Sequence, residues 1–112
     1  MEVQASARDT GIPPMKARFL VDMVRGKSVT EALTLLAFTP SPSARLVAKV
    51  IKSAAADAES VHQIPVEDLK VARIYADEAR TLKRFRSRSR GRVSPILKRS
   101  SHITVIVAGQ EI

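Results

Sequence analysis

The sequence has no cysteine and no tryptophan, and aromatic residues are rare among its 112 residues. Without cysteine, disulfide bonds and thiolate metal sites are excluded. The aromatic residues are Phe19, Phe38, Tyr75 and Phe85, so we expect a core built from aliphatic side chains. An apolar share of 45% is typical of a folded domain rather than a disordered chain.

Long apolar runs are also missing. No run approaches the roughly 20 residues needed to cross a bilayer. The first residues, Met-Glu-Val-Gln, lack the basic and apolar regions of a signal peptide. We therefore expect a soluble cytoplasmic protein, and a chain of 112 residues is expected to form a single domain, residues 1–112.

Acidic residues are absent from one long stretch, because none lies between Glu78 and Glu111. Within that stretch, the segment from Arg80 to Arg99 holds nine basic residues. Only 10 of the 19 basic residues then remain for the rest of the chain, against all 11 acidic ones, so this segment accounts for the net charge of +8. A concentrated positive field of this kind favours a polyanion as partner, and the pI near 10.6 favours nucleic acid.

The first half of the chain predicts one strand and three helices. Alternation over residues 2–8 predicts the strand. A helix with apolar residues at helical spacing is predicted to begin at Pro14 or Met15. Gly26 ends this helix, since glycine accepts a left-handed backbone without cost. The capping-box pattern Ser28-Val-Thr-Glu31 begins a second helix, which ends near Phe38. Ser41 caps a third helix over about 42–61.

Two further strands bracket the basic segment. One begins near Leu69, with Leu69, Val71 and Tyr75 expected on one face and Ile74 on the other. The last strand includes Ile103–Val107 and is rich in β-branched residues. We therefore expect a β-hairpin whose arms contain the basic segment and reach roughly 40–50 Å, at about 3.3 Å per residue.

The hairpin composition suits RNA. Arginine outnumbers lysine from Arg80 to Arg99, and guanidinium groups bind phosphate bidentately and stack on bases. Ser87, Ser89 and Gly91 are small enough to let the backbone approach a crowded surface. An alternative interpretation is a short disordered arginine–serine tract, although β-type sequence on both sides argues against it.

Other classes of function remain open at this stage. The first two helices could form a helix-turn-helix in a DNA-binding or regulatory module that uses the cationic hairpin, but the second helix offers little to a major groove. A peptide or membrane-surface binder would need an apolar face beside the charge, which the hairpin lacks. The three basic residues Arg45, Lys49 and Lys52 form a helical face that, alone, suits a solvated surface.

An enzyme is not expected. Gly26-Lys27-Ser28 resembles the end of a phosphate-binding loop, but Val21 stands where that motif needs glycine. His62 and His102 are the only histidines and neither has a ligand cluster, so each is expected to be satisfied or exposed. We expect no catalytic residue, no metal ion and no cofactor.

The motifs together resemble the bacterial large-subunit ribosomal protein family known as L-twenty-two. The resemblance covers about Pro14 to Val107. Its motifs are Lys16-Ala-Arg18, Val24-Arg-Gly-Lys27, Glu31-Ala-Leu33, Lys52-Ser-Ala54, Ala58-Glu59, Leu82-Lys-Arg84, Arg90-Gly-Arg92, Ile96-Leu-Lys-Arg99 and Ser101-His-Ile-Thr104.

The resemblance implies an α+β fold: a three-stranded antiparallel sheet packed on three helices, with a long protruding β-hairpin. The globular body would comprise about 1–79 and 100–112, and the basic hairpin about 80–99. The implied function is that of a structural constituent of the large ribosomal subunit, which binds large-subunit ribosomal RNA and supports assembly. The hairpin tip would line the nascent-peptide exit tunnel.

The resemblance also implies partners and contact residues. The partners would be large-subunit ribosomal RNA, neighbouring large-subunit proteins and the nascent peptide, with no membrane and no homo-oligomer. The expected RNA-binding residues, with the two lysines of the long helix added, are Lys16, Arg18, Arg25, Lys27, Lys49, Lys52, Lys83, Arg84, Arg86, Arg88, Arg90, Arg92, Lys98 and Arg99. The expected hairpin tip is Arg86, Ser87, Arg88, Ser89, Arg90, Gly91 and Arg92.

Overall fold

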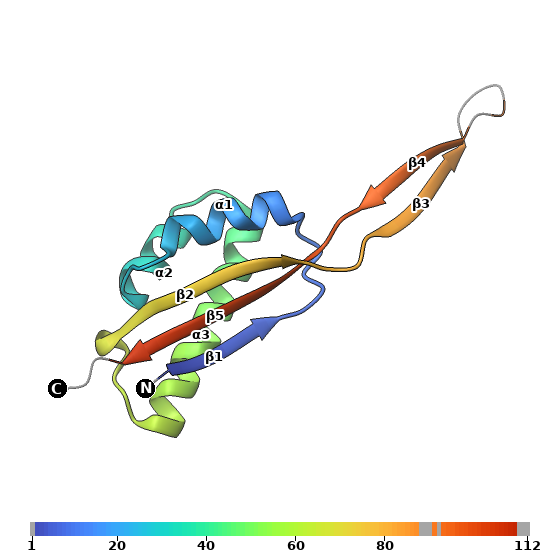
Figure 1. Cartoon of the computed structure of the whole chain (residues 1–112). Coiled ribbons are helices and arrows are strands. Elements are labelled where there is room, and N and C mark those ends of the chain that lie inside the picture. The colour runs from blue at the N-terminus through green and yellow to red at the C-terminus, as the bar shows by residue number, and fades with distance from the viewer. Residues whose placement is uncertain (1, 88–90, 92, 110–112) are drawn as a thin grey trace.

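The structure, a computed structural model, describes residues 2–87, 91 and 93–109, and of residues 84–87 and 93–96 it describes the backbone alone. Figure 1 shows how the elements follow one another. In chain order they are β1 (Glu2–Ala7), α1 (Pro14–Val24), α2 (Val29–Ala37), α3 (Pro42–His62), a short 3-10 helix (Val66–Asp68), β2 (Leu69–Glu78), β3 (Leu82–Ser87), β4 (Val93–Lys98) and β5 (Ser101–Gly109).

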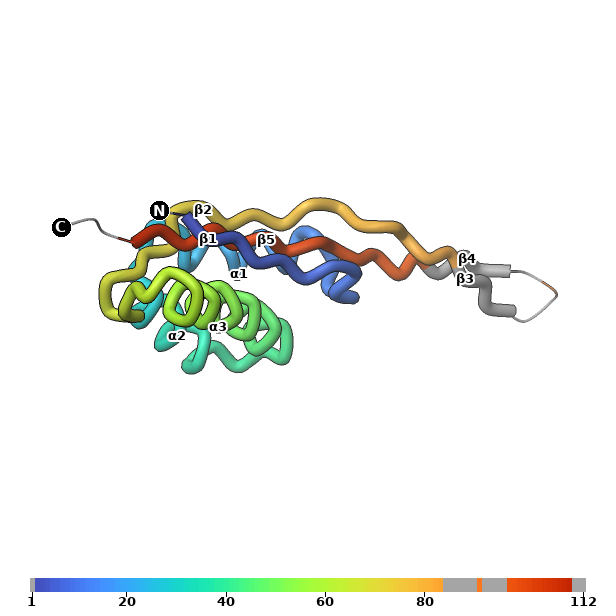
Figure 2. Tube along the Cα trace, turned by 90° about the horizontal axis from the view of Figure 1, so that it is seen from below, coloured from blue at the N-terminus to red at the C-terminus, as the bar shows by residue number. Residues whose placement is uncertain are grey.

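The body is built on an antiparallel sheet in which β5 lies between β1 and β2. The register of β1 on β5 runs from Glu2 opposite Ala108 to Ala7 opposite Ile103. Figure 2 shows the helices on one side of this sheet. Helix α3 packs across β5 and β1, and α1 packs along β2. This arrangement confirms the predicted α+β class, with a three-stranded sheet on three helices.

The helices begin and end where the sequence predicts. Pro14 occupies the first turn of α1, where its missing amide hydrogen costs nothing. Gly26 has a φ of +78°, the left-handed conformation that reverses the chain after α1. The Ser28 hydroxyl accepts a hydrogen bond from the Glu31 amide at 3.2 Å, and Ser41 accepts one from Ser43 at 3.3 Å.

The core is aliphatic, as the scarcity of aromatics predicts. Phe19 and Phe38 are 67% and 84% exposed, and Tyr75 is 40% exposed. The apolar stripes of the helices are buried as expected: Ala17, Leu20, Val21, Val24, Val47, Val50, Ile51, Ala54 and Ala58. Val61 is 69% exposed because it lies in the last turn of α3, past the last buried residue.

A β-bulge in β2 changes which side chains face the core. The register on β5 shifts between Val71 and Arg73, so Ala72 is an extra residue. After it, Ile74 faces the core and Tyr75 lies on the open face. The predicted face assignment for these two residues is therefore wrong, because strict alternation holds only without a bulge.

Candidate nucleic-acid interface

The two arms of the predicted hairpin pair with each other. Strand β3 is antiparallel to β4 in an unbroken register, from Leu82 opposite Lys98 to Ser87 opposite Val93. Figure 1 shows this pair continuing beyond the ends of β2 and β5. The pairing places the basic segment on opposed strands, while the full reach of the hairpin stays a prediction.

The predicted contact residues of the hairpin are described to different extents. Lys83, Lys98 and Arg99 are exposed. The backbones of Arg84, Arg86 and Ser87 lie in β3, and Gly91 has a φ of +74°, a conformation that glycine adopts readily. The other predicted tip residues, Arg88, Ser89, Arg90 and Arg92, lie outside the described residues.

A network of hydrogen bonds fixes the base of the hairpin. The amide of Ala79 donates to the carbonyl of Ser100 at 3.0 Å, so the two chains are joined between the sheet and the arms. The loop after β1 then binds the returning chain. The amide of Thr10 donates to the carbonyl of Ser101 at 3.1 Å, and the amide of Gly11 donates to the Ser100 hydroxyl at 2.9 Å. The arms therefore leave the body from a braced root.

Two side chains at the root have satisfied polar groups. The Ser101 hydroxyl is fully buried, donates to the carbonyl of Ile12 at 2.9 Å and lies 3.0 Å from the Thr10 hydroxyl. His102 accepts a hydrogen bond through Nδ1 from the amide of Asp9 at 3.1 Å. This bond supports the expectation that His102 is a satisfied histidine.

A depression of about 420 Å³ lies beside this root. Arg80, Lys98 and Arg99 line it together with Leu82, Ser100, Gly11 and Asp9. Arg80 was not among the predicted contact residues, although it opens the basic segment. It lines the depression together with Lys98 and Arg99, at the end of the β3–β4 pair where Leu82 lies opposite Lys98.

The body contributes a second group of cations, on α1 and the turn after it. Lys16, Arg18, Arg25 and Lys27 are all exposed, as the prediction requires. Figure 1 shows that α1 begins beside the base of the hairpin. The first cations of this group therefore lie at the same end of the body as the root of the hairpin.

Two of these arginines also hold α1 against the open edge of β2. Arg25 donates from Nη2 to the carbonyl of Ile74 at 2.9 Å, and Arg18 donates from Nε to the carbonyl of Ala76 at 3.3 Å. The turn after α1 covers the next part of the edge, since Val71 donates to the carbonyl of Lys27 at 2.8 Å. The sheet edge is thus blocked against pairing with another chain.

The predicted pair Lys49 and Lys52 lies elsewhere. Both are on α3, where they line a groove shared with α2 rather than the hairpin or α1. Sequence reasoning also missed two exposed apolar side chains, Met15 and Phe19, at 83% and 67% exposure one turn apart on α1. Both lie outside the apolar stripe of α1 that is buried, so the spacing of that stripe was the signal that would have found them.

Two other kinds of site are missing from the described parts of the chain. No group of three or more histidine, cysteine, aspartate or glutamate residues there is arranged to hold a metal ion. No helix among these residues combines the length and apolar character that a membrane span needs.

Comparison with known proteins agrees with this architecture. The family model described as ribosomal protein L22p/L17e matches residues 5–108. A protein of Dehalococcoides mccartyi strain 195 named large ribosomal subunit protein uL22 is 64% identical over 108 residues, which is 96% of this chain and 99% of the relative. Proteins of the same name from Ligilactobacillus salivarius and Pediococcus pentosaceus are 51% and 47% identical, over 94% and 96% of this chain and 91% and 92% of those relatives. The chain belongs to the ribosomal protein L22p/L17e family, which is the L-twenty-two family that its motifs resemble.

Proposed function

We propose that this protein is a structural constituent of the large ribosomal subunit that binds large-subunit ribosomal RNA through its basic hairpin. The observation that carries the proposal is the segment from Arg80 to Arg99, nine basic residues without an acidic one, on two paired strands. Phosphates of folded RNA are the polyanion that such a narrow cationic element fits. The relatives, named large ribosomal subunit proteins, support the same assignment.

The body supplies the anchoring end of this RNA surface. Lys16, Arg18, Arg25 and Lys27 lie exposed on α1 and its turn, near the hairpin root. Each guanidinium has five donors, and the bonds to β2 use only some of them, so the others remain for phosphate. Phe19 stands beside Arg18 and offers an exposed ring for stacking on an unpaired base.

The arms and the tip of the hairpin, residues 80–99, have different tasks. The arms bind RNA phosphates and fix the position of the protein, which supports subunit assembly. The tip, residues 86–92, reaches the wall of the exit tunnel and meets the nascent peptide. Nothing in this function needs a catalytic group, and we propose that the protein is not an enzyme and acts in the cytoplasm as part of the subunit.

The DNA-binding alternative has little in its favour. Helix α2 would be the recognition helix of a helix-turn-helix, but its nine residues include no basic or amide side chain. The turn before it is hydrogen-bonded to β2 at Val71 rather than free to set a helix in a groove.

Sedimentation tests the proposal. The tagged protein is expressed in cells, and a lysate is run through a sucrose gradient at moderate salt. We expect co-migration with the large subunit. Migration as a free protein, or with DNA, would contradict the proposed function.

A further inference from the structure

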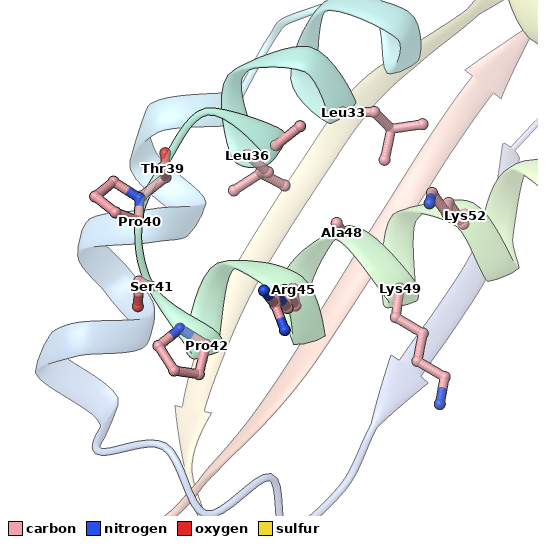
Figure 3. Close-up of a pocket in the computed structure, with 11 residues that line it drawn as sticks. Leu33, Leu36, Thr39, Pro40, Ser41, Pro42, Arg45, Ala48, Lys49 and Lys52 are labelled. Atoms are coloured by element: carbon pink, nitrogen blue, oxygen red, sulfur yellow. The ribbon is translucent and has the colours of Figure 1, made fainter.

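A groove of about 570 Å³ separates α2 from α3 on the helical side of the body (Figure 3). Its walls come from the two helices and from the Thr39–Pro42 segment that joins them. The lining residues are Leu33, Leu36, Ala37, Thr39, Pro40, Ser41, Pro42, Arg45, Ala48, Lys49 and Lys52. None of these residues is acidic.

One wall of the groove is a row of uncompensated positive charge. Arg45, Lys49 and Lys52 are exposed and follow one another at i, i+4 and i+7 on α3. At 1.5 Å per residue the row spans about 10 Å along the helix. Among the described residues, none forms an ion pair or a hydrogen bond with these three side chains. Their charge is left for a ligand from outside the described chain.

The other part of the groove is aliphatic. Figure 3 shows Leu33 and Leu36 on α2 above Ala48 on α3. Pro40 and Pro42 complete the apolar end, and no aromatic residue lines the groove. RNA bases are usually held by stacking on aromatic rings or on guanidinium planes, of which this groove has only the guanidinium of Arg45. Aliphatic side chains of a protein pack well on a surface of this kind.

We propose that this groove is the docking site for an acidic segment of another protein of the large subunit, with carboxylates on the row and aliphatic side chains against the leucines. Charge complementarity selects the segment, because a row of three cations attracts a row of carboxylates. The aliphatic floor favours protein over RNA as the source of the negative charge. A helix with carboxylates at the same i, i+4 and i+7 spacing matches the row. Lys49 and Lys52 are thereby assigned to a protein contact instead of the predicted RNA contact.

The inference rests on the proposed function only in placing the partner within the subunit. The test uses intact large subunits purified from cells that express the tagged full-length chain. A water-soluble carbodiimide joins an amine to a carboxylate only when the two are in direct contact, and it does not join lysine to internal phosphodiesters. We expect amide cross-links from Lys49 or Lys52 to aspartate or glutamate within an aliphatic segment of one other subunit protein, identified by mass spectrometry.

A second measurement reports whether the groove is covered at all. Acetic anhydride modifies exposed lysines, and we expect at least a fivefold slower modification of Lys49 and Lys52 in the subunit than in the free chain. If the two lysines are modified equally fast in both states, nothing docks there and the proposal is wrong. If they are protected but give no amide cross-link, and ultraviolet light joins this face to RNA, then RNA occupies the groove and the proposal is also wrong.

Matched variants separate charge from packing. The double variant Lys49→Arg, Lys52→Arg keeps the positive row but removes both amines, so the cross-links should disappear while the tagged chain still enters the subunit.

The variant Leu33→Glu places a carboxylate on the apolar wall and should reduce the cross-links from Lys49 at least threefold. Circular dichroism of the purified variant checks that it is folded, and unchanged cross-links in a folded variant would contradict the docking model. Absence of every tagged chain from the subunit would instead overturn the proposed function together with this inference.

Discussion

Arg18 and Arg25 each contribute to the fold and to the proposed RNA surface. Their side chains lie off the buried stripe of α1, and the sequence predicts that much. The sequence gives no signal that they donate to Ile74 and Ala76, because those contacts depend on how α1 lies along β2. A basic residue near a sheet edge can therefore stabilise the body before any RNA is bound.

Replacing Arg25 by alanine tests this structural role. The change removes the hydrogen bond to the Ile74 carbonyl and the ion pair with Asp22, and we expect the free energy of unfolding to fall by about 1 kcal/mol. Urea unfolding of the free protein measures the change. Lys16→Ala is the matched control, because Lys16 is exposed on α1 and makes no such bond among the described residues. Equal stability of the two variants would contradict this structural role of Arg25.

Replacing Ser101 by alanine tests the hydrogen bonds at the root of the hairpin. Its buried hydroxyl donates to the Ile12 carbonyl and meets the Thr10 hydroxyl, so Ser101→Ala removes both of these contacts at the root. We expect a loss of about 1–3 kcal/mol in the free energy of unfolding. The exposed Ser53 gives the control, and Ser53→Ala should change stability by no more than about 0.5 kcal/mol. A Ser101 variant as stable as this control would contradict the bracing role.

At the scale of elements, the helices were predictable and the detail of β2 was not. Helix starts depend on local chemistry, such as the Ser28 and Ser41 caps, and helix faces depend on apolar spacing. The bulge at Ala72 has no local signal, so the faces of Ile74 and Tyr75 were reversed. The groove between α2 and α3 also escaped prediction, because it needs the angle between two helices.

The arms of the hairpin are predicted to act mainly through charge. In the double variant Lys98→Gln, Arg99→Gln two exposed cations of the returning arm are lost. Binding to a fragment of large-subunit ribosomal RNA should weaken, and the slope of log K against log salt should become less steep by about 1.5–2. Arg73→Gln is the control, since Arg73 pairs with Glu2 on the open face of the sheet. A slope unchanged from the parent protein would exclude these phosphate contacts.

At the scale of the whole molecule, the body and the hairpin are expected to be separable. Every described residue of the buried core lies outside residues 80–99. Arg84 and Ile96 are partners in the β3–β4 register, so residues 85–95 can be replaced by a two-residue Asn-Gly turn. We expect the shortened protein to unfold within about 1 kcal/mol of the parent, because no described core contact is removed. Loss of the cooperative unfolding transition would contradict the proposed division.

The shortened protein also separates docking from tunnel contact. It should still co-sediment with the large subunit through its body and the remaining arms, while the response of the ribosome to drugs that bind the tunnel changes. An unaltered drug response would place the tip away from the tunnel wall.

The most direct test of the central claim is a cryo-electron microscopy map of large subunits isolated from cells that express this chain. We expect the basic side chains of residues 80–99 to lie within hydrogen-bond distance of ribosomal RNA phosphates along both arms, with residues 86–92 at the wall of the exit tunnel. A map in which the body is bound but the hairpin extends into solvent would contradict the claim that the basic segment is the RNA-binding element of the protein.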